Sequence, residues 1–212
     1  METDKVNLKQ LIISVITVIA IEMSGAAFIS AGRFNPLIIQ GLIRLLQTFF
    51  IILILFALGK GLSSMGLKFS GMFQGIKRGL VWSASFGLVV ALGFVILLIL
   101  KINPLALIHS ALPSDQRELI LFFIVGVLLA PVAEEIFFRG ILYGFFRRWG
   151  IAFALFMSTS LFALAHLAIS GIPITQIIGG VLFAVSYEIE KNLFTPITIH
   201  VLGNLAIFLI SL

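Results

Sequence analysis

Long uninterrupted apolar stretches are the feature that most restricts the fold of this 212-residue chain. Crossing about 30 Å of hydrocarbon takes about 20 helical residues, and apolar stretches near that length recur along the whole sequence. Charged residues make up 11% of the chain, whereas an average soluble domain carries about 25%. So few polar side chains cannot cover a soluble fold. The sequence therefore indicates a polytopic membrane protein and excludes a soluble enzyme, a nucleic-acid-binding module and a disordered chain.

Seven apolar segments are candidates for membrane helices. We expect an all-α helical bundle, because a transmembrane β-barrel would show short segments of alternating polarity. The fourth segment is long enough to be two helices broken at Pro131, so seven or eight transmembrane helices are predicted. The predicted spans are 8–30, 37–59, 79–100, 119–146, 151–169, 174–188 and 193–212.

The unusual residues are unevenly distributed along the chain. Residues 1–118 contain three plain apolar spans, whereas most of the ionisable residues within spans come later. We therefore predict one membrane domain with two functional parts, three N-terminal transmembrane helices at 1–118 and a helical core at 119–212 that carries the activity.

The net charge of +5 would suggest nucleic acid in a soluble protein, but in a membrane protein it indicates cytoplasmic loops. Basic residues gather in alternate loops, which predicts a cytoplasmic N-terminus and an odd number of spans. The predicted cytoplasmic bases are Lys5, Lys9, Lys60, Lys68, Lys77, Arg78, Arg147, Arg148 and Lys191, and the predicted outer bases are Arg33, Lys101 and Arg117.

Ionisable residues inside membrane spans are costly and mark function by default. Most of those in this chain fall in three short segments, Glu-Glu-Ile-Phe-Phe-Arg, Phe-Ala-Leu-Ala-His and His-Val-Leu-Gly-Asn. Away from the ends of the predicted spans, the acidic and basic residues are Glu22, Arg44, Glu134, Glu135, Arg139, His166 and His200.

Helical spacing gives these segments a geometry, because residues at i and i+4 share a face. Glu135 and Arg139 are expected to pair within one helix, while Glu134 points about 100° away and keeps a carboxylate directed into the bundle. Two adjacent carboxylates cannot both ionise readily in a low dielectric, which suits one of them to act as a general base. His200 and Asn204 likewise present two polar groups on one face.

Other interpretations remain open from the residues alone. A Glu–Arg pair between membrane helices can be purely structural, as we expect for Glu22 and Arg44. The Glu and His residues could also form a proton or cation relay in a transporter or channel component, although no inverted repeat is visible. A third interpretation is a membrane chaperone or immunity factor that keeps the motifs without catalysis.

The motifs Glu-Glu-x-x-x-Arg, Phe-x-x-x-His and His-x-x-x-Asn together resemble those of the CPBP family of intramembrane proteases. This family is also called Abi or CAAX-protease-like, and the resemblance covers roughly residues 119–212. It implies an intramembrane endopeptidase that cleaves a membrane-associated or lipidated protein or peptide with activated water.

The resemblance also implies a role for each motif residue. Glu134 would be the general base that activates water, and His166 would help to hold that water. Glu135 and Arg139 would shape and orient the site. The oxyanion would be stabilised by His200 and Asn204.

The cofactor is left open by the sequence. The chain has no cysteine, and its two motif histidines are not spaced as in the His-Glu-x-x-His motif of zinc proteases. We therefore favour metal-free hydrolysis that depends on Glu134, with a divalent metal such as zinc as the alternative. The expected partners are the lipid bilayer and a membrane-anchored or hydrophobic peptide, and no nucleic acid. The expected location is the inner membrane of a prokaryotic cell.

Overall fold

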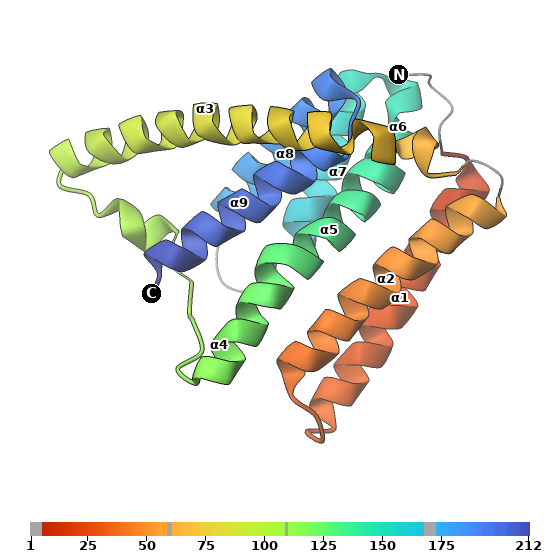
Figure 1. The fold of residues 1–212 in the computed structure, drawn as a ribbon, viewed down its shortest axis with the longest axis horizontal. Coiled ribbons are helices and arrows are strands. Elements are labelled where there is room, and N and C mark those ends of the chain that lie inside the picture. The colour runs from red at the N-terminus through yellow and green to blue at the C-terminus, as the bar shows by residue number, and fades with distance from the viewer. Residues whose placement is uncertain (1–5, 59–60, 109, 168–172) are drawn as a thin grey trace.

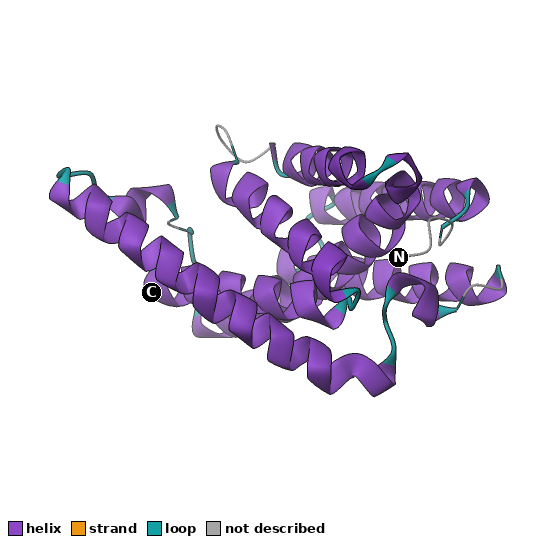
Figure 2. Cartoon of the chain, turned by 90° about the horizontal axis from the view of Figure 1, so that it is seen from above, coloured by secondary structure: helices purple, strands orange, loops and turns teal. Residues whose placement is uncertain are grey.

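The computed structural model describes residues 6–58, 61–108, 110–167 and 173–212. Within these ranges every regular element is a helix (Figure 2), so the predicted all-α fold is confirmed. The α-helices are α1 (Leu8–Ser30), α2 (Pro36–Ala57), α3 (Met72–Ile99), α4 (Gln116–Phe123), α5 (Ala130–Glu135), α6 (Gly144–Phe146), α7 (Ile151–Ala165), α8 (Ile174–Glu190) and α9 (Phe194–Ile210).

The helices lie where the apolar segments predicted them, but they differ in length. Among the residues that the structure describes, four helical segments are long and apolar enough to cross a membrane, and these are Leu8–Ser30, Pro36–Ala57, Leu62–Ile99 and Gln116–Trp149. Helices α7, α8 and α9 have 15, 17 and 17 residues, or about 22–26 Å at 1.5 Å per residue. Residues 168–169 of the fifth predicted span lie outside the described ranges, as do Lys5 and Lys60 from the predicted orientation.

Polar caps determine where several helices begin. The side chain of Asn7 accepts a hydrogen bond from the amide of Gln10, and the Gln10 side chain accepts one from the Asn7 amide, which forms a capping box before α1. Asn35 caps α2 directly before a proline in the first turn. Asp115 caps α4 by accepting from two backbone amides.

The segment Gln116–Trp149 forms one long helix that contains α4, α5 and α6 (Figure 1). The predicted alternative of a break at Pro131 is wrong, because the helix continues through this residue. A π-helical stretch at Ile124–Leu129 comes directly before it and widens the turn. The ring of a proline clashes with the carbonyl of a tight α-helical turn, so the wider turn accommodates Pro131 without a break.

Helices α1 and α2 form an antiparallel pair, which runs beside the long helix in Figure 1. Arg44 on α2 forms an ion pair with Glu22 on α1, as predicted. Gln47 joins this pair by donating a hydrogen bond to Glu22, with 2.9 Å between Nε2 and Oε1. These polar groups satisfy one another, which lets them lie between two apolar helices.

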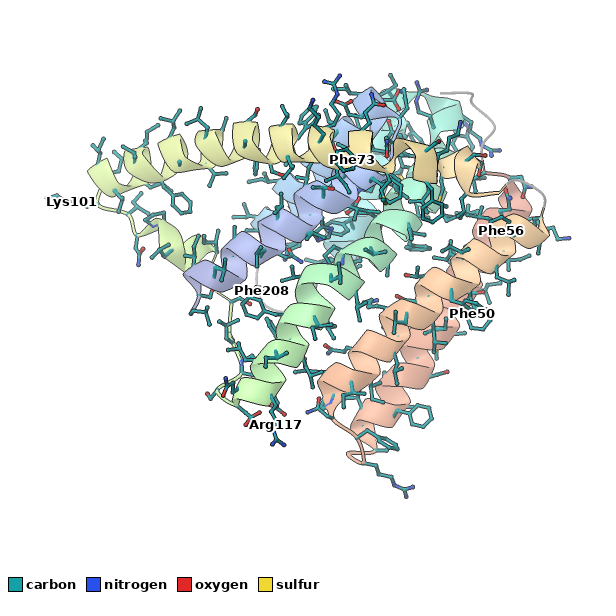
Figure 3. The ribbon with its side chains drawn as sticks, in the orientation of Figure 1. Phe50, Phe56, Phe73, Lys101, Arg117 and Phe208 are labelled. Carbon is teal, nitrogen blue, oxygen red and sulfur yellow. The ribbon has the colours of Figure 1, made fainter. Side chains whose placement is uncertain are left out.

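The outer surface is strongly apolar, as expected for contact with lipid. Phe50 and Phe56 project from the outer side of α2 in Figure 3, and Phe56 is 58% exposed. In contrast, Glu135 and Arg139 on the long helix are both fully buried. Soluble proteins bury apolar groups and expose charged ones, so the opposite distribution at these positions supports a membrane setting.

Helix α3 runs across one end of the bundle and packs along α9 (Figure 1). A glycine permits this close approach, because a Cβ atom at Gly79 would lie 2.5 Å from the Cβ of Thr198 and 2.9 Å from the backbone oxygen of Thr195. Small residues let membrane helices approach in this way. The contact holds α9, and therefore His200, against a long helix from the N-terminal part.

A tight turn at Gly150 joins the long helix to α7. Gly150 has φ +107°, a conformation that favours glycine. The two helices run antiparallel from this turn, and Glu134 and His166 each lie 16 positions away from it. Residues at equal distances from such a turn lie at similar levels along the two helices. The turn therefore brings these two side chains to the same depth.

Candidate active site

The centre of the candidate site is a fully buried ion pair. Arg139 donates from Nη1 to Oε1 of Glu135 over 2.9 Å, and both side chains are 0% exposed. The pair spans i and i+4 of the long helix, as the spacing predicted. Because burying either charge alone would be costly, the pair acts as one unit within the bundle.

Three aromatic rings and a backbone carbonyl complete the surroundings of Arg139. Its Cζ atom lies 4.7 Å from the ring centre of Phe162 and 5.1 Å from that of Phe183, with Phe138 at 6.0 Å. Its Nη2 atom donates to the carbonyl oxygen of Gly180 over 3.1 Å. Cation–π contacts strengthen when the cation is removed from water, so the rings help to hold the guanidinium in place.

Glu134 faces both motif histidines. Its Oε2 atom lies 3.8 Å from Nε2 of His200 and 4.0 Å from Nε2 of His166. The Glu134 side chain is 13% exposed, so it is not sealed in the core as its neighbour Glu135 is. The structure thus brings together on three helices the residues that the sequence placed in three separate motifs.

The second nitrogen of each histidine ring is already engaged. Nδ1 of His166 lies 2.8 Å from the carbonyl oxygen of Phe162, and Nδ1 of His200 lies 2.8 Å from Oε1 of Glu135. A carbonyl or carboxylate oxygen can only accept, so Nδ1 carries the hydrogen in both rings. These contacts orient both rings with Nε2 toward Glu134.

An aromatic ring supports each imidazole. Phe162 packs against His166 with 4.6 Å between ring centres, as the shared face of the Phe-x-x-x-His motif predicted. Phe183 stacks on His200 with 4.5 Å between ring centres and 19° between planes. These rings restrict the rotation of both histidines.

Asn204 lies one turn beyond His200 on α9 and also faces the long helix. Its Nδ2 atom donates to the carbonyl oxygen of Gly126 over 2.8 Å. In this π-helical stretch the amide of Ala130 bonds to Val125, so the next bond in the same register would join residue 131 to Gly126. Residue 131 is a proline without an N–H. Asn204 therefore supplies the hydrogen bond that the proline cannot, and only one of its two amide hydrogens is needed for this.

With a cytoplasmic N-terminus, the predicted spans 151–169 and 193–212 place His166 near the outer end of one span and His200 in the inner half of the other, and the structure resolves this conflict. Helix α7 ends at Ala165, so His166 lies at the end of a short helix and not at the far end of a full span. The turn at Gly150 then sets its level beside Glu134.

Two contributors to the site come from α8, which carries none of the motifs. Gly180 provides the carbonyl that accepts from Arg139, and Phe183 stacks on His200. Gly180 lets α8 approach α7 closely, because a Cβ at this position would lie 3.0 Å from Cγ2 of Thr159 on α7. Phe183 is one of 21 phenylalanines, and no sequence pattern distinguishes it from the others.

The comparison with known families identifies the part of the chain that holds this site. Residues 116–206 match the family model described as "Rce1-like: Type II CAAX prenyl endopeptidase Rce1-like". No curated protein and no solved structure gives a significant match. The matched segment runs from the start of α4 into α9 and contains all six predicted site residues. Over this segment the chain is similar to the Rce1-like family of CAAX-type proteases, in agreement with the resemblance of its three motifs.

Proposed function

We propose that this protein is an intramembrane endopeptidase that hydrolyses a peptide bond of a membrane-associated or lipidated substrate with water activated by Glu134. One observation carries the proposal: a carboxylate faces two imidazole nitrogens at 3.8 and 4.0 Å beside a fully buried ion pair. The family match over residues 116–206 supports protease activity.

The distances around Glu134 suit a water molecule between the three groups. At 3.8 and 4.0 Å, the Glu134 oxygen is too far from either Nε2 for a direct hydrogen bond. A water in this position would donate one hydrogen to Glu134 and the other to Nε2 of His166. Its lone pair would then be available to a carbonyl carbon.

Hydrolysis follows from these positions. Glu134 accepts a proton from the water while the water oxygen bonds to the carbonyl carbon of the substrate. The resulting tetrahedral intermediate carries a negative charge on the former carbonyl oxygen. When it collapses, the carbon–nitrogen bond breaks and the nitrogen takes the proton from Glu134. The products are a carboxylic acid and an amine, which ionise to a carboxylate and an ammonium group, and Glu134 is restored as a carboxylate.

We assign oxyanion stabilisation to His200 and Asn204. In its protonated form His200 donates through Nδ1 to Glu135 and keeps Nε2–H for the oxyanion. The second amide hydrogen of Asn204 is the other donor.

The residues do not form a clear metal site. Carboxylate oxygen and imidazole nitrogen are ligands that zinc accepts. Within the part of the chain that the structure describes, however, no group of three or more His, Cys, Asp or Glu side chains is arranged to hold a metal ion. We therefore derive no step through a metal and propose that Glu134 acts directly on water.

Cleavage is expected to depend on a membrane anchor in the substrate, because the site lies among apolar helices. A segment that enters the bilayer gains about 0.8 kcal/mol per buried CH₂ group, which concentrates it near Glu134. The test compares one peptide with and without a hydrophobic anchor, using the protein reconstituted in liposomes, with and without a metal chelator. We expect faster cleavage of the anchored peptide and no effect of the chelator. Equal cleavage of both peptides would contradict delivery through the bilayer, and loss of activity in chelator would favour a metal.

Replacement of Asn204 by alanine is expected to lower the cleavage rate by about 10²–10³-fold, because one oxyanion donor is lost. The protein should still fold, with a loss of about 1 kcal/mol from the missing hydrogen bond to Gly126. The rate is measured in liposomes and the stability by thermal unfolding in detergent. A variant that is less stable but cleaves at the normal rate would show that Asn204 has only a structural role, through its hydrogen bond to Gly126, and does not stabilise the oxyanion.

A further inference from the structure

A polar cavity of about 440 Å³ lies outside the candidate active site, between the segment 63–78 and the turn that joins α8 to α9. Its lining includes three basic side chains, Lys68, Arg78 and Lys191, and one acidic side chain, Glu190. The cavity therefore carries an excess of positive charge. Cationic cavities of this kind suit an anionic ligand.

Hydrogen bonds between the two chain segments hold the walls of this cavity. The Asn192 side chain donates from Nδ2 to the carbonyl oxygen of Gly71 over 2.8 Å. Thr195 donates from Oγ1 to the carbonyl oxygen of Gly75 over 3.2 Å. A Cβ at Gly75 would lie 2.6 Å from the Asn192 side-chain oxygen, so this close contact between the two walls requires a glycine.

The charges of the cavity do not cancel. Glu190 accepts from the indole of Trp82 over 3.1 Å and lies 3.6 Å from Arg78. Lys191 forms its ion pair with Glu188 instead, at 2.6 Å. Among the described residues Lys68 forms no ion pair. In addition, α3 begins beside the cavity without a side-chain cap, so the positive end of a 28-residue helix lies there.

Exposed aromatic side chains lie next to Lys68 in the sequence. Phe69 is 74% exposed and Phe73 is 84% exposed, and Figure 3 shows Phe73 on α3 close to the end of the bundle where α8 and α9 meet. A free inorganic anion has no apolar part that could contact these phenylalanine side chains. A molecule with a charged head and apolar tails can contact both features at once, as at a membrane interface.

We propose that this cavity binds the phosphate of an anionic phospholipid headgroup. Lys68 and Arg78 bind the phosphate, and Phe69 and Phe73 contact the acyl region of the same lipid. The bound lipid would lie between the 63–78 segment and the start of α9, the helix that carries His200. This proposal does not depend on the proposed protease activity.

The test measures thermal unfolding of the purified full-length protein in a neutral detergent. Phosphatidylglycerol, phosphatidylcholine and inorganic phosphate are titrated separately, each at the same phosphorus concentrations. We expect phosphatidylglycerol to raise the unfolding temperature at the lowest concentration. Equal stabilisation by phosphatidylcholine would overturn the proposal, because it would show no preference for an anionic head.

Phosphatidylglycerol titrations of one variant and of its matched control identify the site. Lys68→Ala should weaken the apparent affinity for phosphatidylglycerol about fivefold, since a base near an anionic surface contributes about that factor. The matched control Lys77→Ala removes the same charge from α3 outside the cavity, and we expect less than a twofold change. Equal effects of the two variants would show general surface attraction and overturn the proposal. If Lys68→Ala lowers stability without lipid, Lys68→Gln replaces it.

A third variant separates a lipid from a free anion. Phe73→Gln should weaken binding of phosphatidylglycerol and leave any binding of inorganic phosphate unchanged. If inorganic phosphate protects as well as phosphatidylglycerol and Phe73→Gln changes neither, the cavity binds a free anion and the lipid proposal is wrong.

Discussion

Replacing Glu134 by glutamine is expected to lower the rate of peptide cleavage by about 10²–10⁴-fold, because glutamine cannot accept the proton of the attacking water. Glutamine has nearly the same shape as glutamate, and the Glu134 side chain forms no hydrogen bond within the described residues. The variant should therefore fold normally. Cleavage of an anchored peptide is measured in liposomes, and folding is measured by thermal unfolding.

A matched control comes from the same helix. Glu118 is exposed near the start of α4 and accepts a hydrogen bond from Asn35 over 2.9 Å, far along the helix from the site. Glu118→Gln should keep the rate within a few-fold of the unmodified protein. Glu134→Asp, which keeps the carboxylate but withdraws it, should retain more activity than Glu134→Gln. A glutamine variant with a near-normal rate would remove Glu134 from the mechanism.

The largest effect on stability is expected for Arg139→Ala, which leaves Glu135 as a buried charge without its guanidinium partner. Removing one member of a buried ion pair typically costs about 3–5 kcal/mol. The contacts of Arg139 with Phe162 and Phe183 are lost as well. We expect a much lower unfolding temperature in detergent. The exposed Arg117, near the start of the same helix, is the matched control, and its change to alanine should alter stability by no more than about 0.5 kcal/mol.

A double-mutant cycle tests whether Glu135 and Arg139 act as one unit. The variants are Glu135→Gln, Arg139→Met and the double change, because methionine fills much of the arginine volume without its charge. We expect the double variant to be about 1–3 kcal/mol more stable than the sum of the single effects predicts. Additive effects would show that the two side chains do not depend on each other.

The sequence predicted much of this arrangement because helical periodicity is local. The i and i+4 spacing of Glu135 and Arg139 sets their pairing within one helix, and the same spacing directs His200 and Asn204 toward one neighbour. The lengths of the apolar segments likewise predicted the helix positions. Each of these predictions needed only residues within a few turns of one another.

The remaining features depend on contacts between helices, which have no local pattern. The stacking of Phe183 on His200 arises from how α8 packs against α9. The bond from Asn204 to Gly126 requires a π-helical turn, and the sequence around Pro131 suggested a broken helix instead. The short helices α7, α8 and α9 were also predicted as membrane spans, because apolar composition alone does not determine where a helix ends.

The turn at Gly150 restricts insertions and deletions in the two helices that it joins. The level of His166 beside Glu134 depends on equal numbers of residues in the two arms of this hairpin. One inserted or deleted residue in either arm would shift one side chain by about 1.5 Å along the helix and turn it by about 100°. Lipid-facing positions on these arms can be substituted, but the lengths of the two arms are fixed relative to each other. Among homologous sequences, insertions and deletions should therefore be rare between Glu134 and His166 and commoner in the connection between α3 and α4.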